Sequence, residues 1–183
     1  MAEAQPKMAL EAFLAWENAH DEKHEFYQGE VFDMVGALRV HARIVSNLCF
    51  ALRKGLEGKR CQPFSESAKV QVEERAIFYP DVFVTCDERD LTTEQIFRYP
   101  TFICEVASPS PALYDRGLKF AAYRKIVELR EYLVVDPETR EITLFRKAAS
   151  GNFELLEFTE ADTFILESVE CRISRTDLFD GCW

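Results

Sequence analysis

Two carboxylates interrupt stretches of sequence that are otherwise apolar. Asp81 follows Pro80 within residues 77–84, and Glu105 is the only charged residue of residues 101–107. A carboxylate inside an apolar strand costs free energy unless it is paired, hydrogen-bonded or bound to a cation. Two such strands, adjacent in one sheet, would place two hard oxygen ligands within reach of one Mg²⁺ or Mn²⁺ ion. We therefore predict a divalent-metal site between Asp81 and Glu105. The alternative, in which each carboxylate caps a loop or pairs with an arginine, stays open.

The elements that must position these carboxylates follow from the spacing of apolar residues. Helical spacing predicts two helices before the carboxylates, one after them and a short one near the C-terminus, over residues 7–19, 38–56, 115–127 and 176–179. Alternating or continuous apolar runs predict the strands and hairpins, over residues 24–32, 68–72, 77–85, 101–107, 132–135, 142–145, 153–158 and 169–173.

The order of the central elements predicts the fold class. A strand over 101–107, a helix over 115–127 and a strand over 131–136 form a βαβ unit, whose two strands run parallel. The hairpins elsewhere are antiparallel. We expect an α/β fold: a mixed β-sheet flanked by helices, with added β-hairpins. No repeat or linker divides the chain, so we predict one domain over residues 1–183.

Charge and hydropathy narrow the classes of function. The net charge is −10, which argues against broad, sequence-independent attraction to phosphate backbones, although a local basic face or bound cations can offset it. There is no run of about 18 uncharged apolar residues, so we expect no membrane span. The first residues lack a signal peptide, which predicts a cytoplasmic protein.

The six cysteines show no Cys-x-x-Cys pair and no histidine at zinc-finger spacing. In a cytoplasmic protein thiols are kept reduced. We therefore predict that all six are reduced and structural.

Several blocks of the sequence resemble the Uma-two family of restriction-endonuclease-like proteins, within the PD-(D/E)XK nuclease superfamily. The blocks are Pro80-Asp81 and residues 27–30, 105–110, 114–123 and 129–136. The similarity runs in order from about residue 8 to the C-terminus, and residues 105–123 are its most specific part.

This resemblance implies a set of metal ligands. Asp81, Glu105 and the backbone carbonyl of Val106 would bind Mg²⁺ or Mn²⁺, and Glu25 is the best candidate for a further carboxylate. Glu30 is a second acidic residue of the same segment. An ordinary exposed strand carboxylate remains the alternative for Glu25.

The superfamily places a lysine two residues after the glutamate, but Ala107 occupies that position here. The resemblance therefore implies that Lys119, on the following helix, takes the lysine's part in catalysis, with Lys69 as the weaker alternative. Tyr123 lies one turn after Lys119, where it either supports the lysine or fills the core; we favour the core. His41 could touch a phosphate, but a lone histidine is more often structural.

By resemblance, the predicted function is metal-dependent hydrolysis of phosphodiester bonds by an endonuclease, with DNA as the expected substrate and a homodimer as the expected assembly. The competing interpretation is a protein that keeps the nuclease fold for binding or assembly without catalysis. The displaced lysine and the net negative charge favour the non-catalytic interpretation, whereas the intact Asp81–Glu105 pair favours the nuclease.

Overall fold

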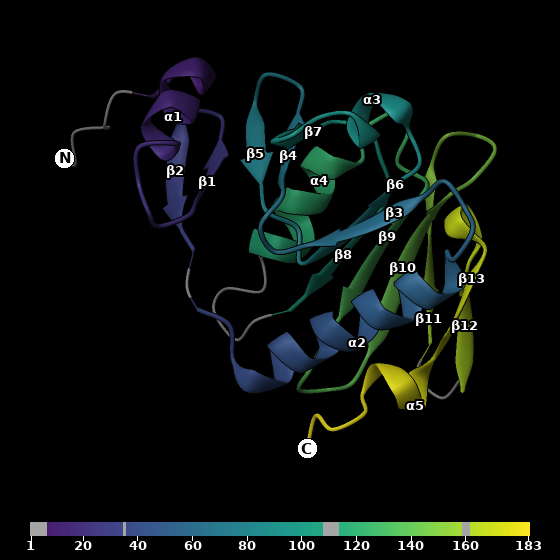
Figure 1. Ribbon diagram of the computed structural model, residues 1–183. Coiled ribbons are helices and arrows are strands. Elements are labelled where there is room, and N and C mark those ends of the chain that lie inside the picture. The colour runs from purple at the N-terminus through teal and green to yellow at the C-terminus, as the bar shows by residue number, and fades with distance from the viewer. Residues whose placement is uncertain (1–6, 35, 108–113, 159–161) are drawn as a thin grey trace.

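Two mixed β-sheets and their flanking helices make up the computed structural model, which describes residues 7–34, 36–107, 114–158 and 162–183 (Figure 1). The five-stranded sheet has the order β2 (Glu30–Asp33), β1 (His24–Tyr27), β5 (Ala76–Phe78), β4 (Lys69–Val72), β7 (Ile96–Phe97). The six-stranded sheet has the order β11 (Phe153–Glu157), β10 (Ile142–Lys147), β9 (Glu131–Val135), β8 (Pro100–Val106), β6 (Val82–Thr85), β3 (Gln62–Ser65). A separate hairpin joins β12 (Thr163–Leu166) to β13 (Cys171–Ser174).

Four of the five described helices lie where the apolar spacing predicts them; the exception is a short helix at Glu88–Leu91, where no helix was expected. They are α1 (Leu10–Glu17), α2 (Arg39–Gly55), α3 (Glu88–Leu91), α4 (Phe120–Tyr123) and α5 (Arg175–Leu178), with a 3₁₀ turn at Glu167–Val169. A π-helical segment, Tyr114–Lys119, leads directly into α4, so the helix predicted over 115–127 ends earlier and begins with a wider turn. The predicted break at 108–111 lies outside the described residues. No described helix is long and apolar enough to cross a bilayer.

The predicted βαβ unit is confirmed. β8 and β9 pair in parallel, with Glu105 opposite Val134, and every other pairing in the six-stranded sheet is antiparallel. The hairpin predicted within residues 24–32 is also present, as β1 and β2. Its turn uses Gly29 at a φ of +94°, and a Cβ there would lie 2.5 Å from Cβ of Lys7. Only glycine therefore fits that turn.

One predicted strand is divided between the two sheets. Residues 77–85 were expected to form a single strand, but β5 belongs to the five-stranded sheet and β6 to the six-stranded sheet. The chain crosses between them at residues 79–81, where Pro80 has no N–H to give to a ladder. Asp81 therefore precedes β6 and does not lie within a strand.

Apolar side chains cover both faces of the six-stranded sheet. Along β8, Phe102, Cys104 and Val106 pack in one cluster with residues of α2, while Ile103 packs in a second cluster with residues of α4 and the five-stranded sheet. Because strand side chains alternate, Glu105 shares the face of Ile103. The β8 register thus sends this carboxylate toward the helix that carries Lys119.

The prediction of six reduced cysteines is wrong. Cys61 and Cys86 form a disulfide, whereas Cys49, Cys104, Cys171 and Cys182 are free thiols. The antiparallel pairing of β3 with β6 sets Gln62 opposite Thr85, so the next residues outward, Cys61 and Cys86, face each other with Cα atoms 4.0 Å apart. The two cysteines lie 25 positions apart in the sequence, and their spacing alone does not indicate that they pair.

Candidate metal and catalytic site

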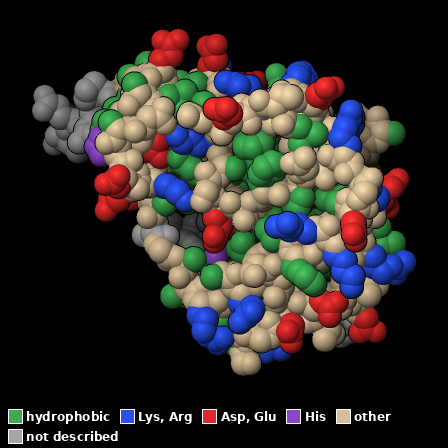
Figure 2. Space-filling view, viewed as in Figure 1, with side chains coloured by type: hydrophobic (Ala, Val, Ile, Leu, Met, Phe, Trp, Pro, Cys, Tyr) green, Lys and Arg blue, Asp and Glu red, His purple; other side chains and the backbone are tan. Residues whose placement is uncertain are grey.

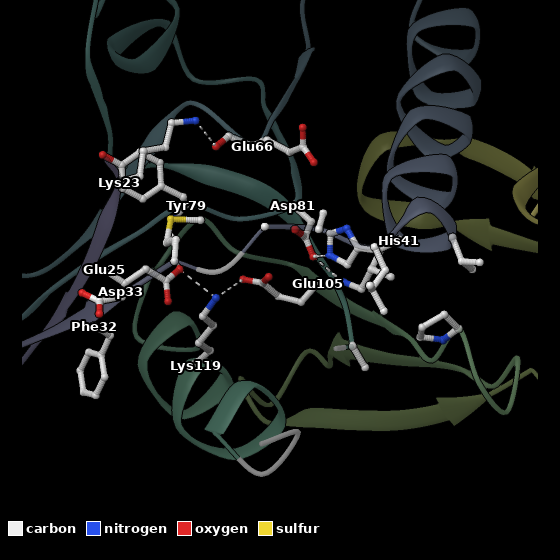
Figure 3. A pocket seen from close by; sticks show the side chains of 18 of the residues that line it. Lys23, Glu25, Phe32, Asp33, His41, Glu66, Tyr79, Asp81, Glu105 and Lys119 are labelled. Atoms are coloured by element: carbon white, nitrogen blue, oxygen red, sulfur yellow. Dashed lines mark hydrogen bonds and ion pairs between the residues drawn. The ribbon is translucent and has the colours of Figure 1, made fainter. Parts of the chain in front are cut away.

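A pocket of about 1430 Å³ opens where the two sheets and the start of α2 meet (Figure 3). Its lining includes the residues singled out by the sequence, namely Glu25, Asp81, Glu105, Val106 and Lys119, and also His41. They come from β1, the crossing before β6, the end of β8, the π-helical segment and α2. Residues far apart in the sequence therefore meet at one site.

Asp81 is held by two contacts on one oxygen. Its Oδ2 accepts a hydrogen bond from the backbone N–H of Val106 at 2.7 Å and lies 3.1 Å from Nε2 of His41. Among the described residues both contacts fall on Oδ2, so Oδ1 is the oxygen left for a cation. The carbonyl of a strand residue points to the same side as its N–H. The Val106 carbonyl thus faces the edge of β8 where Asp81 lies.

Glu105 is 4% exposed, and two donors reach the same oxygen of its carboxylate. The hydroxyl of Tyr123 donates to Oε1 at 2.9 Å, and Nζ of Lys119 lies 3.4 Å from it. Burial, reinforced by the negative charges of Glu105 and Glu25, raises the pKa of Tyr123 well above its ordinary value. Tyr123 therefore stays protonated and remains a donor to Glu105.

Lys119 lies between two carboxylates. Its Nζ is 2.8 Å from Oε1 of Glu25 and 3.4 Å from Oε1 of Glu105, and the side chain is nearly buried (Figure 3). The backbone N–H of Tyr79 also donates to Oε1 of Glu25, at 3.2 Å. The ammonium thus approaches Glu105 from the π-helical segment that follows β8. It does so although Ala107 occupies the usual lysine position.

The structure does not bring two of the alternatives to this pocket. Lys69 donates to Oδ1 of Asn18 at 2.8 Å and is absent from the pocket lining. Glu30 is exposed on β2, and it too is absent from the lining. Glu25, which shares the hairpin with Glu30, is buried and faces Lys119.

His41 and Tyr123 lie closer to the candidate site than the sequence predicts. Both contact a carboxylate of the candidate pair, although Tyr123 also fills the core as expected. The sequence gives one weak signal for each contact. Tyr123 lies one helical turn after Lys119, and His41 lies near the start of α2.

A buried network behind the pocket was not foreseen. Glu17, at the end of α1, accepts hydrogen bonds from the Tyr79 hydroxyl at 2.7 Å and from the His24 backbone at 3.0 Å, and its Oε2 lies 3.0 Å from Nδ1 of His24. Burial opposes ionisation of Glu17, but these hydrogen bonds outweigh it and lower its pKa. Because Tyr79 and His24 flank the Glu25 contact, this network fixes α1 against β1 beside the site.

The donor set suits a hard divalent ion. Among the described residues, no three His, Cys, Asp or Glu side chains form a metal-binding group. An ion here would therefore take two carboxylates, Asp81 and Glu105, together with the Val106 carbonyl. Mg²⁺ is commonly held by one or two carboxylates, with water and substrate phosphate completing the shell. Among the residues that the structure describes, seven carboxylate residues and three lysines or arginines line the pocket, so a cation would also lower its negative charge.

Beside the parallel strand pair, the pocket combines an acidic residue at the end of β8, a second one before β6, and a buried lysine. The chain belongs to the Uma2 family, described as "Putative restriction endonuclease", whose family model matches residues 10–176. This match confirms the resemblance seen in the sequence.

Alignments with similar proteins cover most of the chain. Two uncharacterized proteins of Synechocystis sp., slr1290 and sll1609, are 35% and 32% identical to it. The first alignment covers 90% of this chain and 87% of the relative, and the second covers 79% and 84%. A crystal structure described as a putative nuclease belonging to DUF820, from Anabaena variabilis, matches with a TM-score of 0.79 over 96% of this chain and 99% of that one. At 18% identity, that match shows the fold.

Proposed function

We propose that this protein is a metal-dependent endonuclease that hydrolyses phosphodiester bonds of DNA with Mg²⁺ or Mn²⁺. The observation that carries the proposal is the meeting of Asp81, Glu105 and Lys119 in one pocket. Membership of a restriction-endonuclease family supports the same reaction. The expected cytoplasmic location and single-domain organisation are part of this proposal.

Each side chain has a part that follows from its contacts. Asp81 and Glu105 would hold the ion with the Val106 carbonyl. A divalent ion, when bound, polarises the scissile phosphate and lowers the pKa of a bound water. Lys119, whose Nζ lies 3.4 Å from Glu105, stabilises the negative charge that develops at the phosphate. Glu25 holds the ammonium in place from the other side at 2.8 Å.

Two hydrogen-bonding side chains keep the carboxylates oriented. The Tyr123 hydroxyl donates to Oε1 of Glu105, the oxygen that Lys119 also approaches, and so fixes the orientation of this carboxylate. His41 contacts Oδ2 of Asp81, which leaves Oδ1 for the ion. Both are positioning residues in this proposal, because they act through the ligands.

We also propose a two-fold homodimer, because cutting both strands of a duplex generally uses two active sites. In such a dimer the same surface patch of both subunits forms the interface. Sedimentation velocity at micromolar concentrations is expected to show a dimer. A monomer across that range would contradict this part of the proposal.

A non-catalytic binding protein is the second candidate function. The ion pair of Lys119 with Glu25, at 2.8 Å, favours it, because an ammonium held so closely by a carboxylate has less charge to offer a phosphate. Ala107 at the usual lysine position points the same way.

Cleavage assays separate the two candidates. Purified protein with Mg²⁺ or Mn²⁺ is expected to nick or cut DNA, and Asp81→Asn or Glu105→Gln is expected to reduce the rate by orders of magnitude. Glu30→Gln serves as the matched control, because it neutralises an exposed carboxylate outside the pocket and should leave the rate unchanged. Cleavage that persists in both pocket variants would come from a contaminant. If wild-type protein cleaves no substrate with any metal tested, the non-catalytic candidate would be favoured.

A further inference from the structure

A large aromatic side chain stands half exposed at the mouth of the pocket. Trp183 is 57% exposed, and it belongs to the same lining as Asp81 and Glu105. Folded proteins bury most of a tryptophan side chain, so an exposed indole beside a polar site has a flat apolar face available for a ligand.

Hydrogen bonds from two α2 side chains anchor the backbone that carries this ring. Arg39 donates to the carbonyls of Gly181 and Cys182, at 3.3 and 2.8 Å. Asn47 donates to the carbonyls of Leu178 and Asp180, at 3.1 and 2.9 Å, in the part of the segment that precedes them. The tail after α5 is thereby tied to α2, the helix that also carries His41.

The indole itself has two further neighbours. The guanidinium of Arg140 lies 3.9 Å from the Trp183 ring centroid, and the Phe179 ring lies 5.6 Å from it. These contacts orient the ring before any ligand arrives, so little conformational entropy remains to be lost on binding.

Positive charge gathers around the same ring although the chain carries −10 overall. Arg39 and Arg140 contact the tail or its indole, and Nε of Arg43 lies 3.7 Å from the position that a Cβ on Gly181 would take. Figure 2 shows lysine and arginine side chains at the lower left of the molecule, below the hollow, with acidic side chains beside them toward the lower right. An aromatic face among arginines suits a base joined to phosphates.

We propose that Trp183 is a stacking platform for an unpaired base of the nucleic acid whose phosphate enters the pocket. Arg39, Arg43 and Arg140 would face its neighbouring phosphates. This inference rests on the proposed function and narrows its substrate class. A base inside a continuous duplex has its faces covered, so the platform favours single strands, frayed ends or junctions.

Binding measurements test the platform without any need for cleavage. The probe is a short single-stranded DNA, compared with a blunt duplex of the same sequence, in Ca²⁺ and in the Glu105→Gln background. Trp183→Ala is expected to weaken single-strand binding roughly 5- to 100-fold, the range for the loss of one base–aromatic stack, and duplex binding much less. Trp183→Phe is expected to recover part of the affinity. Phe50→Ala is the matched control, because Phe50 is 70% exposed on α2 and lies outside the pocket lining.

Fluorescence gives a direct readout of stacking. The chain has two tryptophans, so Trp16→Phe leaves Trp183 as the sole indole. Quenching of that indole by the single strand is expected, with little quenching by the duplex.

Equal affinity of wild type, Trp183→Ala and Trp183→Phe would overturn the platform even if the wild type cuts DNA. An equal effect of Phe50→Ala would also overturn it, and so would a wild type that binds no single strand. If single-strand binding depends on Trp183 but the protein cuts no DNA, the stacking platform would be supported and the proposed catalysis would be contradicted.

Discussion

Lys119 brings one positive charge between two nearly buried carboxylates. Its Nζ contacts Glu25 at 2.8 Å and Glu105 at 3.4 Å, and all three side chains are less than a tenth exposed. Charges removed from water in this way are stable only while they compensate one another. The same ammonium therefore contributes to stability and, in the proposed reaction, to catalysis.

Replacing Lys119 separates these two roles. Lys119→Met keeps the aliphatic stem and removes the charge, so the unfolding free energy is expected to fall by about 3 kcal/mol, the scale for breaking a buried ion pair. The cleavage rate is expected to fall roughly 100-fold or more, the scale for removing one donor to a developing oxyanion. Calorimetric Mn²⁺ affinity should change far less, because both ligands remain. Wild-type cleavage by a folded Lys119→Met protein would remove the lysine from the mechanism.

At the residue scale, the candidate metal ligands could be predicted from the sequence, whereas the side chains that contact them could not. Asp81 and Glu105 stand out because charged residues in apolar stretches are costly. Tyr123 and His41 give no such signal, since a tyrosine or histidine suits many positions of an amphipathic helix. Their contacts with the carboxylates depend on how α4 and α2 pack, and single-sequence periodicity does not specify that packing.

At the scale of elements, the crossing between β5 and β6 shapes the site. Residues 77–85 have the composition of one buried strand, and the sequence was interpreted in that way. The two sheets divide it because Pro80 cannot donate to a ladder, and Asp81 thereby reaches the N–H of Val106 at the end of β8. The parallel β8–β9 pair was predictable, since a helix between two apolar strands allows few other connections.

The Glu17 contacts between α1 and β1 should make the free energy of unfolding depend on pH in the acid range. The pKa of Glu17 is lowered in the folded protein, so its contribution to stability is present above its usual value of 4.5 and is lost as the pH falls through the lowered value. Glu17→Gln should lower the unfolding free energy by about 2 kcal/mol at neutral pH, because hydrogen bonds to a charged acceptor are lost. Below pH 4.5 the variant should lose stability less steeply than wild type.

Denaturant titrations from pH 3 to 7 measure both effects, and hydrogen exchange should show faster opening of α1 and β1 in the variant. Glu11→Gln, an exposed change on the same helix, is the control. Parallel pH profiles for wild type and Glu17→Gln would contradict the network.

At the scale of the whole molecule, the disulfide between Cys61 and Cys86 ties β3 to the end of β6. It closes a loop of 25 residues, for which chain entropy gives about 3.5 kcal/mol of stabilisation. Reduction is expected to lower the midpoint of thermal unfolding by roughly 7–14 °C for a chain of this length. The Cys61→Ser, Cys86→Ser double variant should show the lowered midpoint and no further response to reductant, whereas Cys49→Ser should keep the response. Six titratable thiols in unreduced, unfolded protein would contradict the bridge.

The most direct test of the metal site is anomalous diffraction from crystals soaked in Mn²⁺. We expect a peak between Asp81 and Glu105, beside the Val106 carbonyl, with metal–oxygen distances of about 2.1 Å. The peak should disappear in crystals of Asp81→Asn and persist in Glu30→Gln. An occupied ion elsewhere, or no peak at this position in millimolar Mn²⁺, would contradict the assignment of these two carboxylates as the metal ligands.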